Sequence, residues 1–339
     1  MSVTNTHPEY QENLASWALI RDSIAGQEKI KAAGETYLPR PSGQSLELYN
    51  AYKARAIYTM YTARAAEGLY GQIFSKEPEI KGDIPELFEK ALNNVDKAGT
   101  SLVQFASDVV WDTLQTHRTA VLVDHAPVPE GTNQADKEKA DLTSFMRWYA
   151  AENITFWQYD IINNKETLVL AVLKEDYSVA GKDKFSPQPK TRYRVLEIVD
   201  GMYRQEIWEN IENVQKVKEW VTTEQYIPML DGKPLDYIPL FFLPGKNPEK
   251  SMLLPIAYLN IGHYQLDAEY KHLLHYTALP TGFGINVKPQ TDPTDPTKLL
   301  PITMGSPVMN FVEGISDGKQ PHIFYLEPSG SGAGCIEKE

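Results

Sequence analysis

The sequence has 339 residues, a length that corresponds to about two domains, and its 42% hydrophobic and 23% charged residues are typical of a folded protein rather than a disordered one. Its 33 basic and 45 acidic residues give a formal net charge of −12, which excludes nucleic-acid binding through a broad basic face. The single cysteine, Cys335, excludes an internal disulfide and a cysteine-rich metal site, and no stretch approaches the ~20 apolar residues of a membrane span.

The first thirty residues predict a helix rather than an export signal. They lack the basic start and the apolar core of a signal peptide. Apolar residues instead recur at helical spacing, which predicts one amphipathic helix from Glu12 to about Ala33. These residues are Leu14, Trp17, Ile20 and Ile24.

A second helical stretch follows the break LPRPSGQS. Ser45 is a candidate N-cap, and the residues after it contain no proline, many alanines and several tyrosines. We therefore expect a single long helix from Ser45 to about Tyr70, ended by Gly68 or Gly71.

Two shorter helices and a strand are expected next. Asp83, followed by proline at an early helical position, predicts a short helix to about Leu92. Ser101 opens another helix, and the β-branched run TAVLVD (119 to 124) predicts a strand after it. The polar residues from 125 to 143 predict an exposed loop.

The middle of the chain changes to strand patterns. Four short runs are rich in β-branched or aromatic residues, and several alternate with a period of two. Asp200-Gly201 stands between two of these runs and is a strong signal for a hairpin turn. We expect an antiparallel meander, followed by a buried strand over residues 238 to 245. The four runs are TLVLAVLK (167 to 174), TRYRVLEIVD (191 to 200), MYRQEIWEN (202 to 210) and KEWVTTEQ (218 to 225).

The last third begins with a helix. The segment from Leu253 to Leu279 has a helical composition, and Pro255 stands where a first turn tolerates it. Its apolar residues do not form one stripe, so we expect it to contact neighbours on more than one face. The residues that follow are rich in proline and glycine, with strands expected at GFGINV, SPVMNFV and HIFYLEP.

The sequence contains no motif of a known enzyme class. Neither the Gly-x-Gly-x-x-Gly pattern nor a P-loop occurs, and the run SGSGAG lacks the P-loop lysine. Gly330-Ser331-Gly332 lacks the spacing of a serine hydrolase, and no spacing singles out a pair of carboxylates for a glycosidase. We therefore expect a protein that is not an enzyme and that uses no cofactor.

The best candidate for a metal site is Glu269-x-x-His272, with His275 one turn further on and His263 two turns before. Such a pair places a carboxylate and an imidazole on one helical face, as in bundle di-iron sites. Those sites need a second pair and two further glutamates, and the sequence has no second copy. A metal-dependent hydrolase using Glu269, His272 and His275 is therefore a remote alternative to ordinary polar residues on a helix.

Two segments resemble a known family. They are LPRPSGQSLELYNAYKARAIYTMYTARAAEGLYGQIFSKEPEI, and YIPLFFLPGKNP followed by LLPIAYLNIGHYQLDAEYKHLLHYTALPTGFGINV. Both resemble head proteins of tailed bacteriophages that are related to the portal proteins. The order of N-terminal helices, meander, Ile-Pro-x-x-x-Phe strand, helix and β-rich piece is also similar. The likeness covers most of residues 35 to 327 and contains no catalytic signature.

The resemblance implies an α+β fold with a portal-like division. Residues 1–252 correspond to the wing, with its helices and antiparallel meander, residues 253–279 to the stem helix, and residues 280–328 to a small β-rich clip. In portals the clip is followed by a second stem helix, a tunnel loop and usually a helical crown. Residues 329–339 correspond to the truncated start of that second helix.

The resemblance also implies a function and partners. A portal subunit forms a homo-oligomeric ring, a dodecamer, at the capsid vertex of the virion, and viral DNA is packaged and ejected through its channel. The implied partners are the terminase large subunit, a head–tail adaptor, the major capsid or scaffold protein, and double-stranded DNA passing without sequence specificity. The alternative within the virion is another head–tail adaptor or a minor capsid protein.

Site residues follow from this portal hypothesis. A stem helix packed against copies of itself would place Leu266, Tyr270 and Leu273 at the subunit interface. If the helix and clip line a channel, Lys271, Lys288 and Lys298 are the lysines nearest the DNA, although ordinary exposed lysines are the alternative. We expect the tract from Thr281 to Glu327 to dock the packaging motor and the adaptor, with GFGINV and HIFYLEP pairing as strands that cross to a neighbouring subunit.

Overall fold

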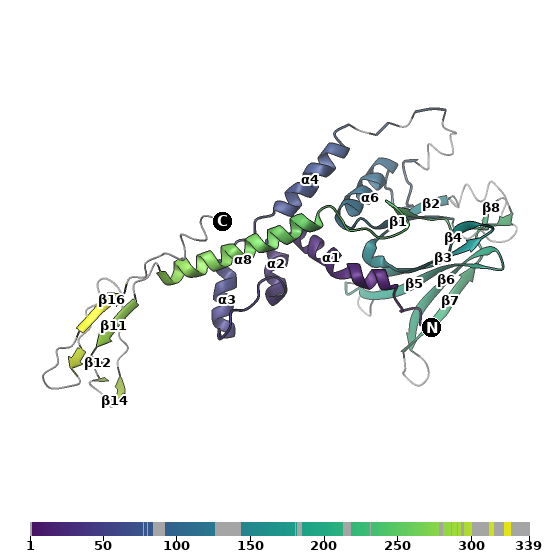
Figure 1. The fold of residues 1–339 in the computed structure, drawn as a ribbon. Coiled ribbons are helices and arrows are strands. Elements are labelled where there is room, and N and C mark those ends of the chain that lie inside the picture. Colours follow the sequence, from purple (N-terminus) through teal and green to yellow (C-terminus); the bar gives the residue numbers. More distant parts are fainter. Residues whose placement is uncertain are drawn as a thin grey trace. The chain divides into compact units, whose positions relative to one another are not determined.

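The computed structural model shows helices and antiparallel strands (Figure 1), which confirms the expected α+β class. Contacts divide the chain into two compact units, Met1–Ile30 with Met60–Asn260, and Lys31–Thr59 with Ile261–Glu339. No helix among the described residues is long and apolar enough to span a membrane. The structure describes residues 2–76, 78–79, 81–83, 92–125, 144–179, 181, 185–212, 218–230 and 232–277, and the strand segments 281–285, 287–289, 291–292, 295–299, 312–314 and 322–326.

Four expected elements lie outside the described residues, wholly or for the most part. They are the short helix after Asp83, the loop after His125, the strand SPVMNFV apart from Val312, and the start of a second helix at residues 329–339.

The amino-terminal helix begins earlier than predicted and is broken in two. Helix α1 spans Pro8–Ala25 and helix α2 spans Gln27–Ala33. His7 caps α1, because its Nδ1 accepts a hydrogen bond from the backbone N–H of Glu9. Gly26 separates the helices with φ of 95°, a conformation that glycine adopts without strain.

The prediction of one helix from Ser45 to about Tyr70 is wrong. Helix α3 spans Leu46–Arg55, helix α4 spans Tyr61–Ile73, and an extended segment separates them. The N-cap Ser45 is confirmed, but both glycines expected to end the helix lie inside α4. The N–H of Ile57, between the helices, donates to Oδ2 of Asp267 at 2.7 Å instead of to a helical carbonyl. A tertiary contact therefore overrides the helical propensity of this stretch.

Helix α6 and strand β1 agree with the prediction. Helix α6 spans Leu102–Thr116, and the hydroxyl of its N-cap Ser101 accepts from the N–H of Gln104 at 3.3 Å. Strand β1 spans Thr119–His125 and lies in a three-stranded sheet of order β10-β1-β2, in which β2 spans Ser144–Ala150. One face of this sheet packs on α6 through Phe105, Val109, Val121, Met146 and Trp148.

The expected antiparallel meander is confirmed and gains one strand. The order of this five-stranded sheet is β3-β4-β5-β6-β7. Asp200 and Gly201 form the predicted hairpin turn, with φ of 50° and 75°. A 3₁₀ turn, Ala151–Asn153, leads from β2 into β3, and neither of these two strands was predicted. The strands are β3 (Ile154–Ile162), β4 (Lys165–Val179), β5 (Gln188–Val199), β6 (Met202–Glu212) and β7 (Lys218–Tyr226).

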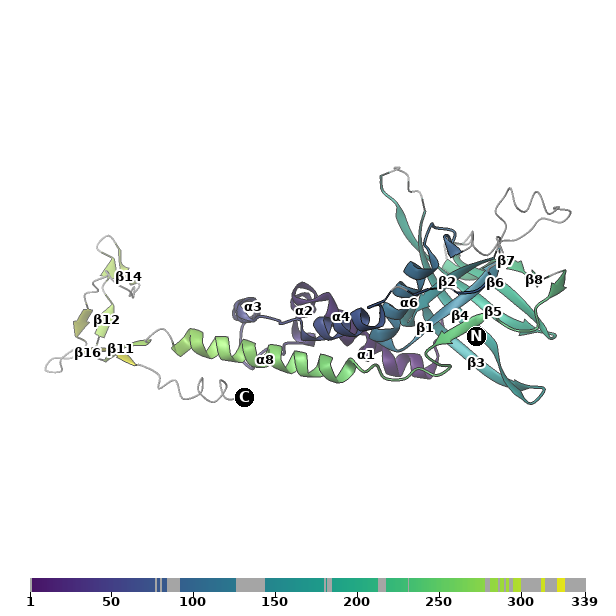
Figure 2. The ribbon, with the colours of Figure 1, turned by 90° about the horizontal axis from the view of Figure 1, so that it is seen from above.

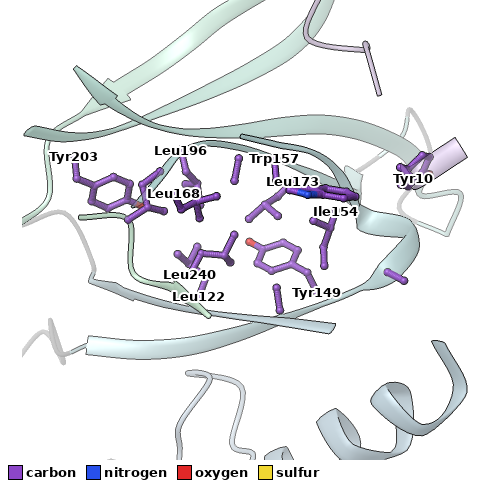
Figure 3. Packing of buried hydrophobic residues seen from close by; sticks show 14 of the residues in the cluster. Tyr10, Leu122, Tyr149, Ile154, Trp157, Leu168, Leu173, Leu196, Tyr203 and Leu240 are labelled. Atoms are coloured by element: carbon purple, nitrogen blue, oxygen red, sulfur yellow. The ribbon is translucent and has the colours of Figure 1, made fainter. Parts of the chain in front are cut away.

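The two sheets face each other across the main hydrophobic core. Figure 3 shows Leu122 and Tyr149 of the three-stranded sheet meeting Leu173 and Leu196 of the five-stranded sheet. On β1, Leu122 points into this core and Val121 packs with α6. Because successive side chains of β1 point to opposite faces, this strand contacts the five-stranded sheet on one side and α6 on the other.

The strand expected to be buried over residues 238 to 245 is an edge strand. Strand β10 spans Leu240–Leu243 and lies at the edge of its sheet, beside β1. Its side chains alternate between the two faces, so Leu240 is buried whereas Phe241 is 54% exposed. A small hairpin precedes it, formed by β8 (Met229–Leu230) and β9 (Lys233–Pro234).

Arg118 ties the turn after β10 to the sheet. Its side chain is fully buried, and Nη1 donates to the carbonyls of Gly245 (3.3 Å) and Lys246 (2.7 Å). The guanidinium carbon lies 4.4 Å from the ring centroid of Trp157 and 3.9 Å from that of Phe242, so two rings enclose the cation. Burial lowers the pKa of Arg118 to about 10, which leaves the side chain charged at neutral pH.

Helix α8 spans Leu254–Thr277, within the predicted 253–279, and Figures 1 and 2 show it as one uninterrupted helix. The boundary between the two units falls within it, after Asn260. A 3₁₀ turn, Gly34–Thr36, precedes α3 in the second unit.

The strands after α8 form three antiparallel pairs. GFGINV and HIFYLEP, expected to cross to a neighbouring subunit, pair with each other in the same chain as β11 (Thr281–Ile285) and β16 (His322–Leu326). Strand β12 (Val287–Pro289) pairs with β15 (Val312–Gly314), and β13 (Thr291–Asp292) with β14 (Asp295–Leu299).

Candidate assembly helix and buried polar network

Helix α8 buries one face against its own chain. The buried residues recur every three or four positions, the pattern of a helix covered on one side. Asn260 belongs to this face, and its Oδ1 accepts from the backbone N–H and the hydroxyl of Thr62, both at 3.1 Å, at the start of α4. The apolar members are Leu253, Leu254, Ala257, Ile261, Tyr264 and Ala268.

Within the second unit, polar side chains of α8 bind the segments around α3. Oδ2 of Asp267 accepts from the N–H of Ile57 (2.7 Å) and from Nζ of Lys271 (2.9 Å). Nε2 of Gln265 donates to the carbonyl of Tyr37 at 2.9 Å. Two of these bonds satisfy backbone groups outside any helix, so they fix irregular segments against α8.

His272 is held from two sides. Its Nδ1 accepts from Nη2 of Arg55 (3.1 Å), and its Nε2 lies 3.1 Å from the side-chain amide of Gln44. The ring of Tyr52 packs against it edge-on, with 4.9 Å between the centroids. Burial lowers the pKa of His272, and the charges of Arg55 and His275 lower it further. Because arginine only donates, Nδ1 of His272 is the acceptor in its bond with Arg55.

These contacts bear on the metal alternative. Both ring nitrogens of His272 face protein groups, and one of these groups is the cationic Arg55, which opposes a second cation. Glu269 is exposed on α8. The part of the chain that the structure describes holds no group of three or more potential metal ligands. Within it, His272 joins α8 to α3 rather than forming a metal site with Glu269.

The opposite face of α8 carries exposed apolar side chains. Leu259 is 75% exposed, Tyr258 59% and Leu266 39%. The three residues expected at a subunit interface, Leu266, Tyr270 and Leu273, share this face because they are spaced by four and three positions. Leu266 is exposed, whereas Tyr270 and Leu273 are half-buried. We call this side of α8, from Tyr258 to Leu274, the assembly face.

The three lysines expected near DNA lie in different settings. The side chain of Lys271 is 27% exposed and pairs with Asp267, on the side of α8 that binds the α3 region. Lys288 lies in β12 opposite Glu313 of β15, and Lys298 lies in β14. The charge of Lys271 is therefore compensated within the helix.

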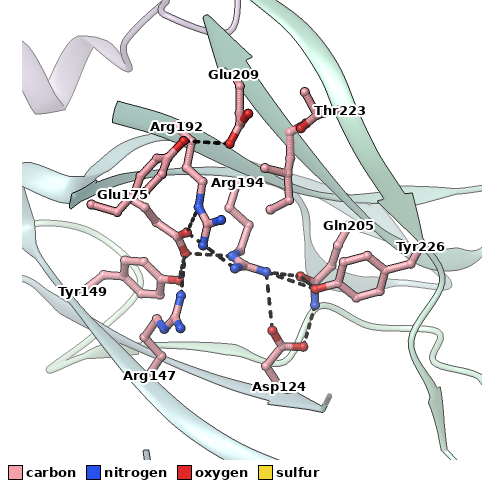
Figure 4. A network of polar contacts seen from close by, with 12 residues as sticks. Asp124, Arg147, Tyr149, Glu175, Arg192, Arg194, Gln205, Glu209, Thr223 and Tyr226 are labelled. Carbon is pink, nitrogen blue, oxygen red and sulfur yellow. Dashed lines mark hydrogen bonds and ion pairs between the residues drawn. The ribbon is translucent and has the colours of Figure 1, made fainter. Parts of the chain in front are cut away.

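A second polar site, which was not predicted, lies between the two sheets of the first unit (Figure 4). Glu175 is at its centre with its side chain only 8% exposed. Its carboxylate accepts from Nη1 of Arg147 (3.0 Å), Nε of Arg192 (2.7 Å), Nε of Arg194 (2.8 Å) and the hydroxyl of Tyr149 (2.7 Å). One carboxylate thus gathers three guanidinium groups from both sheets.

Arg194 extends this network to Asp124 at the end of β1. Its Nη1 donates to Oε1 of Gln205 (2.8 Å) and to the hydroxyl of Tyr226 (3.0 Å), and lies 3.5 Å from Oδ2 of Asp124. Nε2 of Gln205 donates to Oδ1 of Asp124 at 2.8 Å. Burial raises the pKa of Tyr226 to about 12, which keeps its hydroxyl protonated as a donor.

The chemistry of this network is structural. Burial alone raises the pKa of Glu175, but the charge of Arg194 and the hydrogen bonds from Arg194 and Tyr149 outweigh it and lower the pKa to about 2. A carboxylate that stays ionised and fully bonded near neutral pH does not exchange protons as a general acid or base. The network therefore joins the two sheets. Its only signal in the sequence is the alternation of Arg192 and Arg194 on β5.

The chain matches no protein-family model and no curated protein sequence.

Proposed function

We propose that this chain is a structural subunit that assembles into a portal-like ring through the assembly face of α8. The observation that supports this most strongly is the helix with two apolar faces, one covered by its own chain and one exposed. Contiguous exposed apolar side chains on a soluble surface mark an interaction site. The resemblance of this segment to the portal stem helix supplies the partner, which is a further copy of the chain.

The remaining parts of the proposal concern DNA and docking. A net charge of −12 suits a channel through which a polyanion slides, since few lysines would hold phosphates. Lys271 pairs with Asp267, which weakens it as a candidate for contact with passing DNA, and Lys288 and Lys298 remain the other two candidates. The three strand pairs in the tract from β11 to β16 would dock the packaging motor and the tail adaptor. The protein would reside at the capsid vertex of a virion.

Replacing Leu266 by Asp tests the assembly face. Leu266 is 39% exposed in the single chain, so the variant should fold, whereas an interface would bury an unpaired carboxylate at a cost of several kcal/mol. We expect monomers of Leu266→Asp under conditions in which the wild type forms a high-mass assembly, measured by light scattering after size exclusion.

Leu46→Asp is the matched control, because Leu46 lies on α3 and is 62% exposed. It introduces the same charge away from the assembly face and should leave the assembly intact. Normal assembly of Leu266→Asp would contradict the proposal, and so would equal loss of assembly in both variants.

A further inference from the structure

A pocket in the first unit has no residue of the assembly face in its lining; it shares Tyr203 and Leu235 with the main core and Asp124 with the buried polar network. It lies between the end of β1, the start of β6, the β8–β9 hairpin and the segment leading into β10, and has a volume of about 210 Å³. Its rim is apolar and open to solvent. The exposed rim residues are Met229 (55%), Leu230 (60%), Tyr237 (46%) and Phe241 (54%).

The size of the pocket indicates what it can hold. Sites for small molecules and cofactors have volumes of about 300 to 1,000 Å³, which is larger than this pocket. An apolar cavity of about 150 Å³ is enough for benzene. A pocket of about 210 Å³ with an apolar rim therefore fits a single aromatic side chain, the kind of anchor that dominates protein interfaces.

The chain itself carries such an anchor. Phe185, between β4 and β5, is 80% exposed, the largest value among the exposed large hydrophobic side chains that the structure describes. It does not line the pocket, so the pocket of its own chain does not hold it. In the sequence it stands within KDKFSPQPK (182 to 190), with three lysines and one aspartate.

In the sequence, the segment that supplies most of the pocket lining and the segment that contains Phe185 carry opposite net charges. The segment PMLDGKPLDYIPLF (228 to 241), which supplies most of the lining, contains two aspartates and one lysine. Its net charge of −1 complements the net charge of +2 in the segment around Phe185. Complementary charges steer two surfaces into one orientation.

We propose that Phe185 of one copy inserts into the pocket of the next copy. The two features occupy different places on one unit, so a head-to-tail contact can be repeated from copy to copy, as the ring of the proposed function requires. It deepens the proposed function and rests on it, because it adds to the ring a second contact that is independent of α8.

Photo-crosslinking tests the contact directly. Phe185 is replaced by p-benzoylphenylalanine in an unlabelled chain, which is mixed with ¹⁵N-labelled wild type and irradiated, and the cross-linked peptides are identified by mass spectrometry. We expect unlabelled–labelled cross-links from position 185 to the segment 228–241. Met229→Arg in the labelled chain blocks the rim with an exposed, charged side chain and should lower their yield more than about tenfold.

Benzoylphenylalanine at Ile161, which is 73% exposed on β3, is the matched control and should give no cross-links to segment 228–241. The proposal is overturned if position 185 gives no intermolecular cross-links to this segment, or if Met229→Arg leaves their yield unchanged. Loss of assembly in Leu266→Asp with no cross-link from 185 would leave the proposed function standing without this contact. A cross-link from position 185 together with normal assembly of Leu266→Asp would support this contact and contradict the assembly face.

Discussion

Replacing Glu175 by Gln removes the charge at the centre of the network between the sheets and keeps the shape of the side chain. Three arginines and Tyr149 donate to this carboxylate, and Arg194 is itself buried. The nearest remaining carboxylate, that of Asp124, lies 3.5 Å from Arg194. Breaking a buried ion pair from one side is costly because it leaves the opposite charge uncompensated.

The magnitude follows from the pKa of Glu175. A pKa of about 2 in the folded protein, against 4.5 for an unperturbed glutamate, corresponds to ~3 kcal/mol of stability at pH 7. Because the folded pKa is lowered, the unfolded chain binds more protons in this range. The stabilisation is complete above about pH 4.5 and is lost as the pH falls toward about 2.

Urea unfolding at a series of pH values measures this effect. At pH 7 we expect Glu175→Gln to lower the free energy of unfolding by ~3 kcal/mol, or the melting temperature by about 6 to 12 °C. The difference between wild type and variant should shrink as the pH falls from about 4.5 toward 2. Glu166→Gln is the control, because Glu166 is half-exposed beside Lys246 and should matter little.

A loss below ~1 kcal/mol at pH 7 would refute the reasoning, because the three arginines would then not need this charge. A difference between wild type and variant that does not change with pH would refute it too.

Two further substitutions test local structure. Arg118→Leu removes the donor that holds the turn after β10 and leaves the carbonyls of Gly245 and Lys246 without it. The free energy of unfolding should therefore fall by about 2 kcal/mol. An unchanged free energy in urea unfolding would contradict this role of Arg118. Ser101→Ala removes the N-cap of α6 and should cost ~1 kcal/mol, whereas Ser101→Asp, which can accept the same bond from Gln104, should keep most of the stability.

Local signals in the sequence predicted the elements that depend on local physics. Ser101 caps α6, as serine often does at a helix start. Asp200 and Gly201 form the turn between β5 and β6, because both tolerate a positive φ. Four of the five strands of the meander were predicted from their β-branched and aromatic residues, which in several of them alternate with a period of two. The irregular apolar pattern of α8 predicted contacts on more than one face; the structure shows one buried face and one exposed face, so the second contact stays a prediction.

Elements fixed by distant residues were not predictable in this way. The helix expected from Ser45 breaks where Ile57 binds Asp267, a residue 210 positions away. The buried network needs Arg147 and Glu175 side by side, which depends on how two sheets stack and not on either strand alone. Strand β10 was expected to be buried because its residues are nearly all apolar. An apolar run does not indicate whether a strand lies at the centre or at the edge of a sheet, and β10 lies at the edge.

Electron microscopy of the purified wild-type chain is the most direct test of ring assembly. Closed rings of a single rotational symmetry with a central opening are the predicted result, and Leu266→Asp should show none. Wild-type particles that remain single chains at every protein concentration would contradict the account.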